Sequence, residues 1–161
     1  MDLASAGTLG RLFYSELDTL AFTDNEAQLT ADNGDITISS IANHQTDVDA
    51  TGGQGGVITV GGATAKTTLK SHTYATVGDA NQIIADNGTV TISALTDNIE
   101  VNTRAVTDTP AEFAGKNESE AISIVESDTL AEIGGETFIN AGHVTVKSDV
   151  NNVSIKSITD A

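Results

Sequence analysis

The feature that most constrains this chain is a long internal repeat. Gln28 to Ile41 reads QLTADNGDITISSI, and Gln82 to Leu95 reads QIIADNGTVTISAL, so the second stretch lies at an offset of 54 from the first. Applying the same offset again places Val90 on Val144, and the register continues to Ile155 without a gap. Self-similarity at a fixed long period is typical of stacked repeats, in which each repeat covers the next.

Inside the repeat, aliphatic residues alternate with small hydroxyl residues. Two aliphatics flanking one Thr or Ser form the apolar-in, polar-out pattern of a half-buried strand. The chain has 23 threonines, and we expect their β-branched side chains to occupy the outward positions of these strands. The triplets are Ile36-Thr37-Ile38, Ile58-Thr59-Val60, Val90-Thr91-Ile92, Ile122-Ser123-Ile124 and Val144-Thr145-Val146.

Strand-like pieces recur every eight or nine residues, between short turn clusters such as Asp86-Asn87-Gly88 and Thr96-Asp97-Asn98. Three such strands make a coil of roughly 25 residues, and two coils make one repeat. We therefore predict an all-β fold for residues 26–161, a β-solenoid of about five to six coils. Strands about 4.8 Å apart would make it a rod some 25–30 Å long. A Greek-key sandwich is the alternative, but it predicts no sequence repeat at this offset.

Residues 1–25 follow a different pattern. From Thr8 to Ala21 the apolar residues recur at steps of three and four, which predicts an amphipathic helix. We expect this segment to be a helical cap over one open end of the solenoid, or a segment that docks on a partner. The apolar side of this helix would be Leu9, Leu12, Phe13, Leu17 and Leu20.

Two stretches resemble a known family. Ala75 to Ala94, ATVGDANQIIADNGTVTISA, and Ala131 to Lys147, AEIGGETFINAGHVTVK, are similar to repeats of large bacterial β-solenoid surface adhesins, the filamentous-haemagglutinin-like and leukotoxin-like filamentous adhesins. The resemblance covers about residues 27–161 and implies a right-handed β-helix, secretion, an extracellular or cell-surface location, and a structural or adhesive role. Such adhesins are usually very long, so it also implies that 161 residues are a segment or a smaller relative.

The charge and composition exclude several classes of function. Seven basic and 23 acidic residues leave a net charge of -16, which would repel nucleic acid and anionic lipid. No stretch approaches the roughly 18 apolar residues of a membrane-spanning helix, and the absence of cysteine excludes disulfides and thiolate metal sites. No secretory signal is visible after Met1. The acidity is typical of a solubilising surface; a marine or high-salt surface with divalent cations is the alternative.

Calcium has no specific motif in this chain. The stretch GGQGGV at residues 52–57 begins like the calcium-binding GGxGxD repeat, but Val57 stands where the ligating Asp is needed. The Asp32-Asn33-Gly34-Asp35 cluster lacks EF-hand spacing, and an Asx-Gly turn needs no metal. The three histidines show no zinc-site spacing. We therefore expect no cofactor and no metal site. The histidines are His44, His72 and His143.

No catalytic residue is expected either. The chain has no GxSxG or P-loop pattern. β-Helix enzymes that bind or cleave acidic polysaccharides are the alternative function, because fold does not fix function. Arg104 is the one basic residue in the middle of the solenoid that resembles a catalytic cation, and an acidic rod would repel uronic-acid substrates.

The solenoid prediction makes the open ends the candidate site. Unpaired strand edges recruit other chains unless they are covered, and Val153 to Ile158 is strand-like almost to the last residue. We expect head-to-tail self-association or continuation in a longer chain, with surface glycans as further possible partners, and neither nucleic-acid binding nor membrane insertion. The predicted assembly residues are Leu9, Leu12, Phe13, Leu17, Leu20, Val153, Ile155 and Ile158.

Overall fold

Every regular element of the protein is a β-strand in the computed structural model, which describes residues 4–53, 56–108 and 111–160. Two parallel sheets form, one with the order β1-β4-β6 and one in which β5 lies between β7 and the pair β2 and β3. The strands are β1 (Ala4–Thr23), β2 (Gln28–Ala31), β3 (Ile36–Gly52), β4 (Gly56–Val77), β5 (Gln82–Thr107), β6 (Ala111–Ile133) and β7 (Phe138–Asp160). The all-β prediction is therefore confirmed, and the parallel pairing is compatible with a β-helix.

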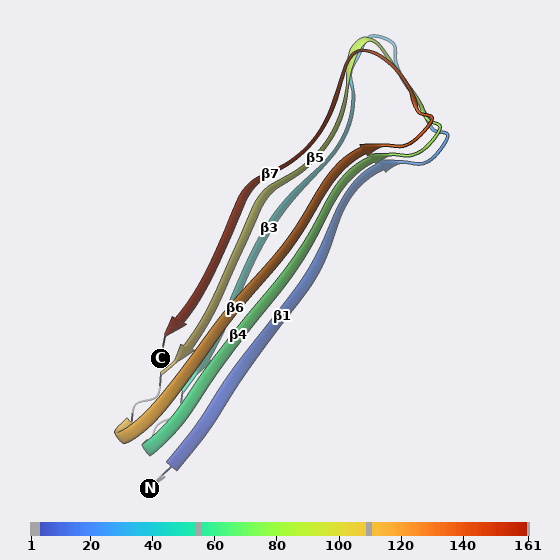
Figure 1. Ribbon diagram of the computed structural model, residues 1–161. Helices are drawn as coiled ribbons and strands as arrows, with labels where there is room; N and C mark the ends of the chain where they lie inside the picture. The colour runs from blue at the N-terminus through green and yellow to red at the C-terminus, as the bar shows by residue number, and fades with distance from the viewer. Residues whose placement is uncertain (1–3, 54–55, 109–110, 161) are drawn as a thin grey trace.

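The chain follows the same path through both sheets three times. Ala21, Ala75 and Ala131 are register partners on β1, β4 and β6, at offsets of 75 − 21 = 54 and 131 − 75 = 56. We call β1 to β3 the first pass, β4 and β5 the middle pass, and β6 and β7 the third pass (Figure 1). Each repeat of the sequence is thus one complete pass along both sheets.

The predicted coil count of five to six is therefore wrong, because the strands are much longer than the sequence pattern indicated. β5 runs for 26 residues through two clusters that resemble turns. At Asp97 the cluster is a local irregularity, with the register shifting opposite Ala42 and Asn43. At Asn87 the backbone turns left-handed, with φ of 60°. In the first pass the equivalent Asp32–Gly34 segment is a true turn between β2 and β3.

The long axis of the molecule follows the strands (Figure 1). The 22 residues of β4 span about 70 Å at about 3.3 Å per residue. Stacking, in contrast, is only three strands deep in each sheet. The short rod predicted from stacked coils is therefore wrong in both length and direction. Both chain termini lie at one end of this axis, and the corner between the two sheets lies at the other (Figure 1).

The predicted N-terminal helix is also wrong, because Ala4 to Thr23 form strand β1. Each of these residues has a register partner on β4, from Ala4 opposite Ile58 to Thr23 opposite Val77. A spacing of four residues is even, so it places side chains on one side of a strand as well as on one side of a helix. The ladder of backbone hydrogen bonds to β4 decides between the two.

The core lies between the sheets and is built from alternate residues of the middle pass. We call the side of a sheet that faces the other sheet its inward side. Leu69 of β4 packs there with Ile99 and Val101 of β5, and all three are fully buried. Larger aliphatics cluster near the corner, while alanines such as Ala65 and Ala105 fill the core farther along the strands.

Threonine does not occupy only outward positions, contrary to expectation. Thr67, Thr73, Thr96 and Thr103 are fully buried on the inward side. Their hydroxyl groups satisfy one another across the two sheets: Thr103 donates to Thr67 over 2.7 Å, and Thr96 donates to Thr73 over 3.0 Å. The core therefore contains hydroxyl pairs as well as aliphatic contacts.

Candidate assembly interface

The third pass exposes apolar side chains that the middle pass buries. Val90, Ile92, Ile99 and Val101 of β5 are fully buried. Parallel register partners share one side of a sheet, so their partners on β7 also point inward. The side chains of those partners are between 43% and 50% exposed, because no strand of the described residues pairs with the other edge of β7. They are Val144, Val146, Val153 and Ile155. Val150, opposite the buried Thr96, is likewise 48% exposed.

The first pass shows the same pattern at the opposite edge of the stack. Leu9, Phe13 and Leu17 of β1 lie on the inward side, because their partners on β4 are the buried Ala63, Thr67 and Ser71. All three apolar side chains remain exposed. Each end of the stack therefore presents exposed apolar side chains beside a strand edge that no described strand covers, which is the arrangement that recruits another chain. At the first-pass end the apolar residues are interrupted by Arg11, which lies on the inward side opposite the buried Ala65.

The structure divides the predicted assembly residues by strand parity. Leu9, Phe13 and Leu17 lie on the inward side at the first-pass end, and Val153 and Ile155 lie on it at the third-pass end. The remaining three point outward. They are Leu12 opposite Lys66, Leu20 opposite Tyr74, and Ile158 opposite the exposed Arg104. The prediction included no residue from the start of β7, although the repeat offset already paired Val90 with Val144.

Hydroxyl groups join the passes along the inward side. Thr103 accepts a hydrogen bond from Ser123 of β6 over 2.8 Å, and Ser123 pairs with the exposed Ser157 of β7 over 2.8 Å. Together with Thr67, these side chains form a continuous ladder between the sheets. The ladder ends at Ser157, on the open third-pass end.

The corner is held by side chains that reach from one pass to the next. The Asn25 side-chain oxygen accepts a hydrogen bond from the backbone N–H of Asp79, and the Asp79 carboxylate accepts one from the N–H of Gly135. The buried Asn81 donates to Thr23 Oγ1 and to the carbonyl of Gly78. Such bonds satisfy backbone groups that a sharp turn leaves without ladder partners.

Close stacking at this corner requires glycine. A Cβ added to Gly78 would lie 2.8 Å from the Asp24 carbonyl carbon, and one added to Gly134 would lie 2.6 Å from the Gly78 carbonyl carbon. The register makes Asp24 the first-pass equivalent of both glycines. Within the described residues no strand lies beyond β1, so the Asp24 side chain has room there.

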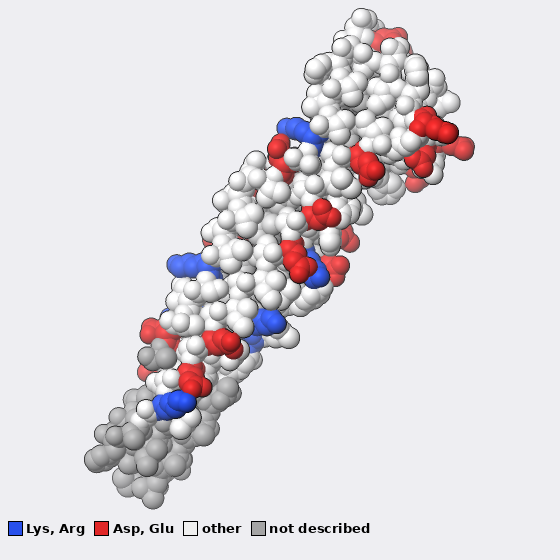
Figure 2. Space-filling model, in the orientation of Figure 1, with Lys and Arg blue, Asp and Glu red and all other residues white. Residues whose placement is uncertain are grey.

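Acidic and basic residues are interspersed along much of the face of the molecule that Figure 2 shows. On sheet β1-β4-β6, Lys70 Nζ lies 2.8 Å from Glu126 Oε2. Farther along β4, Tyr74 donates a hydrogen bond to Asp128 over 2.6 Å and contacts His72 Nδ1 at 3.1 Å. The hydrogen bond to Asp128 raises the pKa of the Tyr74 hydroxyl.

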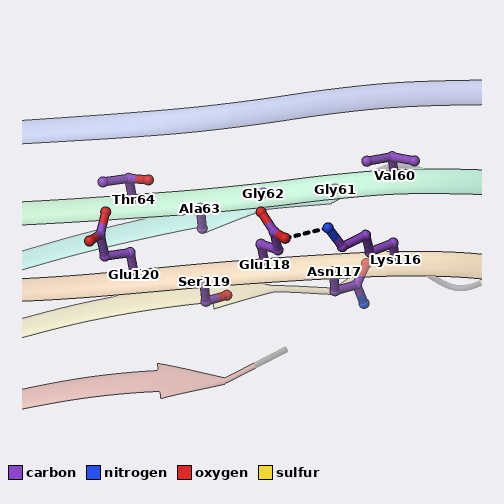
Figure 3. A pocket seen from close by; sticks show the side chains of 10 residues that line it. All are labelled: Val60, Gly61, Gly62, Ala63, Thr64, Lys116, Asn117, Glu118, Ser119 and Glu120. Carbon is purple, nitrogen blue, oxygen red and sulfur yellow. Dashed lines mark ion pairs between the residues drawn. The ribbon is translucent and has the colours of Figure 1, made fainter.

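One groove in the described part of the chain runs between β4 and β6. It has a volume of about 690 Å³ and lies along Val60–Thr64 of β4 and Lys116–Glu120 of β6 (Figure 3). Lys116 Nζ and Glu118 Oε1 face each other there at 2.5 Å. The hydrogen bond from Lys116 lowers the pKa of the Glu118 carboxylate.

A second groove, of about 390 Å³, contains Arg104, the basic residue whose position in the sequence resembles that of a catalytic cation. Arg104 and Lys156 line it together with Asp47, Asp49 and Glu100. It lies on the outward side of sheet β3-β5-β7, since these residues alternate with the buried ones.

The described residues hold no group of three or more metal-ligating side chains. The GGQGGV stretch includes residues 54–55, which lie outside the described ranges, so the structure does not test it. Among residues 4–53, 56–108 and 111–160 there is also no helix with the length and apolar character needed to cross a membrane.

The histidines do not come together. His44 Nε2 lies 2.7 Å from the Ser71 hydroxyl, and partial burial lowers the pKa of the His44 imidazole. His72 contacts Tyr74 on the outward side of sheet β1-β4-β6. His143, on strand β7, is the register partner of Thr89 on β5.

Comparison with protein-family models, with curated proteins and with solved structures found no match for this chain.

Proposed function

We propose that this protein is a non-enzymatic structural protein of the extracellular space or cell surface. In this proposal the three passes are a section of a right-handed β-solenoid, which serves as an adhesin stalk or assembles end to end into filaments. Right-handedness is proposed because parallel crossover connections have this hand in nearly all proteins.

One observation supports the proposal above the others. Four aliphatic residues of β5 in the middle pass are fully buried, whereas their register partners on β7 are 43–50% exposed. At the other end of the stack, Leu9, Phe13 and Leu17 of β1 are exposed opposite buried residues of β4. What covers the middle pass is another copy of the same repeat, so the surface that fits each open end is a further repeat. Contacts of this head-to-tail kind do not close on themselves, and they generate filaments.

The experiment compares two lysine substitutions on neighbouring residues of β7. Ile155→Lys places a charge on the inward side of the open end, and Ser154→Lys places the same charge on the outward side. Negative-stain microscopy and sedimentation velocity across a wide concentration range measure assembly. We expect wild type and Ser154→Lys to form end-to-end species and Ile155→Lys to remain monomeric. A wild-type chain that stays monomeric at every concentration and salt level would refute assembly by these ends.

The adhesin form of the proposal has a separate measurement. Binding of the monomer to immobilised surface glycans, unchanged in Ile155→Lys, would support a stalk that binds ligands without polymerising. If the wild-type protein forms filaments but binds no glycan, the result would favour the filament subunit over the adhesin stalk.

The second candidate function is binding or cleavage of a polysaccharide, and the 390 Å³ groove favours it. Arg104 and Lys156 in this groove could contact acidic groups of a sugar chain. Release of oligosaccharides from an acidic polysaccharide, lost in Arg104→Ala, would establish it. Absence of both binding and release would exclude it.

A further inference from the structure

Two rows of acidic residues run across the outward side of sheet β1-β4-β6, each interrupted in the middle pass. Glu16, Lys70 and Glu126 are register partners, and so are Asp18, His72 and Asp128. Lys70 Nζ bonds Glu126 at 2.8 Å, and His72 Nε2 lies 3.9 Å from Glu16. Inside one chain, a lysine or an imidazole therefore separates the carboxylates of the first pass from those of the third.

A second copy that stacked head to tail would lose this separation. Strand β1 of the incoming copy would take the position beyond β6, as β6 does beyond β4. Glu126 would then lie opposite Glu16 of the incoming copy, and Asp128 opposite its Asp18. Like charges directly opposite each other on neighbouring strands are destabilising.

The inward side of the same joint is favourable. The incoming Leu17 would lie over Ser127 and the incoming Phe13 over Ser123, continuing the registers of β4. On the second sheet, Ile36 and Ile38 of the incoming β3 would cover the exposed Val144 and Val146 of β7, as they pair with Val90 and Ile92 inside one chain. Burial of apolar area drives such contacts.

We propose that the partner of each open end is a second copy of this chain, docked head to tail, and that the facing pairs Glu126–Glu16 and Asp128–Asp18 make the joint dependent on salt. This rests on the proposed function. The apolar inward rows hold the joint together, and the two carboxylate pairs oppose it. The Debye length falls from about 30 Å at about 0.01 M salt to about 3 Å at about 1 M, so added salt promotes assembly.

A charge-swap cycle on the full chain tests the joint. Asp18 and Asp128 each neighbour His72 within the chain, so a lysine at either position faces an imidazole rather than another lysine. At low salt and neutral pH, Asp18→Lys and Asp128→Lys each create an attractive pair across the joint. We expect each single variant to assemble at a concentration about tenfold lower than wild type. The double variant restores a like-charge pair and returns to wild-type behaviour.

Glu100→Lys is the matched control. It makes the same change in net charge on the outward side of the middle pass, away from both ends, and leaves the assembly midpoint within about twofold of wild type. Circular dichroism and urea unfolding of each variant confirm that the monomer is folded.

The outcomes separate this inference from the proposed function. A double variant that assembles as readily as the singles, or a control that shifts equally, overturns the head-to-tail joint while leaving assembly itself intact. A response to Asp128→Lys alone would indicate that two third-pass ends meet, which also overturns it. Failure of every variant to assemble at any salt concentration contradicts the filament form of the proposed function as well.

Discussion

Val101 and Ile155 are register partners on β5 and β7, yet Val101 is fully buried and Ile155 is 50% exposed. Both side chains point between the sheets. The difference arises because β7 covers one edge of β5, and no described strand covers the far edge of β7. Position in the stack, rather than residue type, therefore sets the burial of each repeat position.

This difference predicts unequal costs for one substitution at two positions. Ile99→Ala removes a fully buried side chain and should lower the free energy of unfolding by about 2–5 kcal/mol. Ile155→Ala removes a half-exposed one and should cost about half as much in the monomer. Urea unfolding at low protein concentration measures both. Equal losses would mean that Ile155 is covered even in the monomer.

The buried hydroxyl ladder predicts a cost for removing one oxygen. Thr103→Val deletes the donor to Thr67 and the acceptor for Ser123, and leaving such buried groups without partners costs about 1–3 kcal/mol. Thr91→Val, an outward position on the same strand, should change stability by less than about 0.5 kcal/mol.

A double variant checks the cause of that loss. Thr67→Val combined with Thr103→Val removes both partners of one bond and should cost less than the sum of the single losses. Strictly additive losses would show that the Thr67–Thr103 bond does not contribute.

The sequence repeat predicted which residues are register partners on neighbouring strands, but it did not predict how long the strands of one pass are. The repeat offset placed Val90 on Val144 and Val101 on Ile155, and the register confirms both. The predicted number of coils was wrong because Asx-rich clusters within β5 resemble turns in the sequence. The ladders to β3 and β7, which pair Thr96 and Asn98 with residues of both strands, show that the strand continues past Asp97.

The sequence predicted part of the candidate interface, because some of its residues share one side of both a helix and a strand. Leu9, Phe13 and Leu17 differ by four, so a helix and a strand both place them together. Leu12 fits the helical side but not the strand side, and the sequence alone does not contain the β4 ladder that decides between them. Hydroxyl residues on the inward side could not be distinguished from outward ones, because Thr suits both positions once a partner hydroxyl is present.

Neighbouring glycines at the corner should respond differently to alanine. A Cβ on Gly134 would lie 2.6 Å from the backbone of Gly78, whereas one on Gly135 would meet only Asp79 Oδ1, at 3.7 Å. Gly134→Ala should therefore destabilise the fold by about 1–3 kcal/mol, and Gly135→Ala should be close to neutral. Thermal unfolding of the two variants, compared at equal concentration, makes the measurement. A neutral Gly134→Ala would show that the passes separate easily at this corner.

His44 predicts a dependence of stability on pH. Burial lowers the pKa of its imidazole in the folded chain, so the unfolded state binds more protons once the pH falls below the ordinary histidine value of about 6.5. Stability from this group is complete above that pH and is lost as the pH falls toward the lowered folded pKa. The difference in urea midpoint between wild type and His44→Gln should therefore shrink from pH 7.5 to pH 5.5 or change sign. A constant difference would exclude His44 as the source.

Asp24 predicts a variant that strengthens the head-to-tail joint without any change at the strands. In an incoming copy it would occupy the position that Gly78 and Gly134 hold in the later passes, where an added Cβ lies 2.8 Å and 2.6 Å from the backbone below. Asp24→Gly removes that obstruction and one negative charge, so it should lower the assembly midpoint further than Asp24→Asn, which removes only the charge. Sedimentation velocity at fixed salt compares the two. Equal midpoints would mean that charge alone opposes the joint and that the corner does not stack in the register of the internal passes.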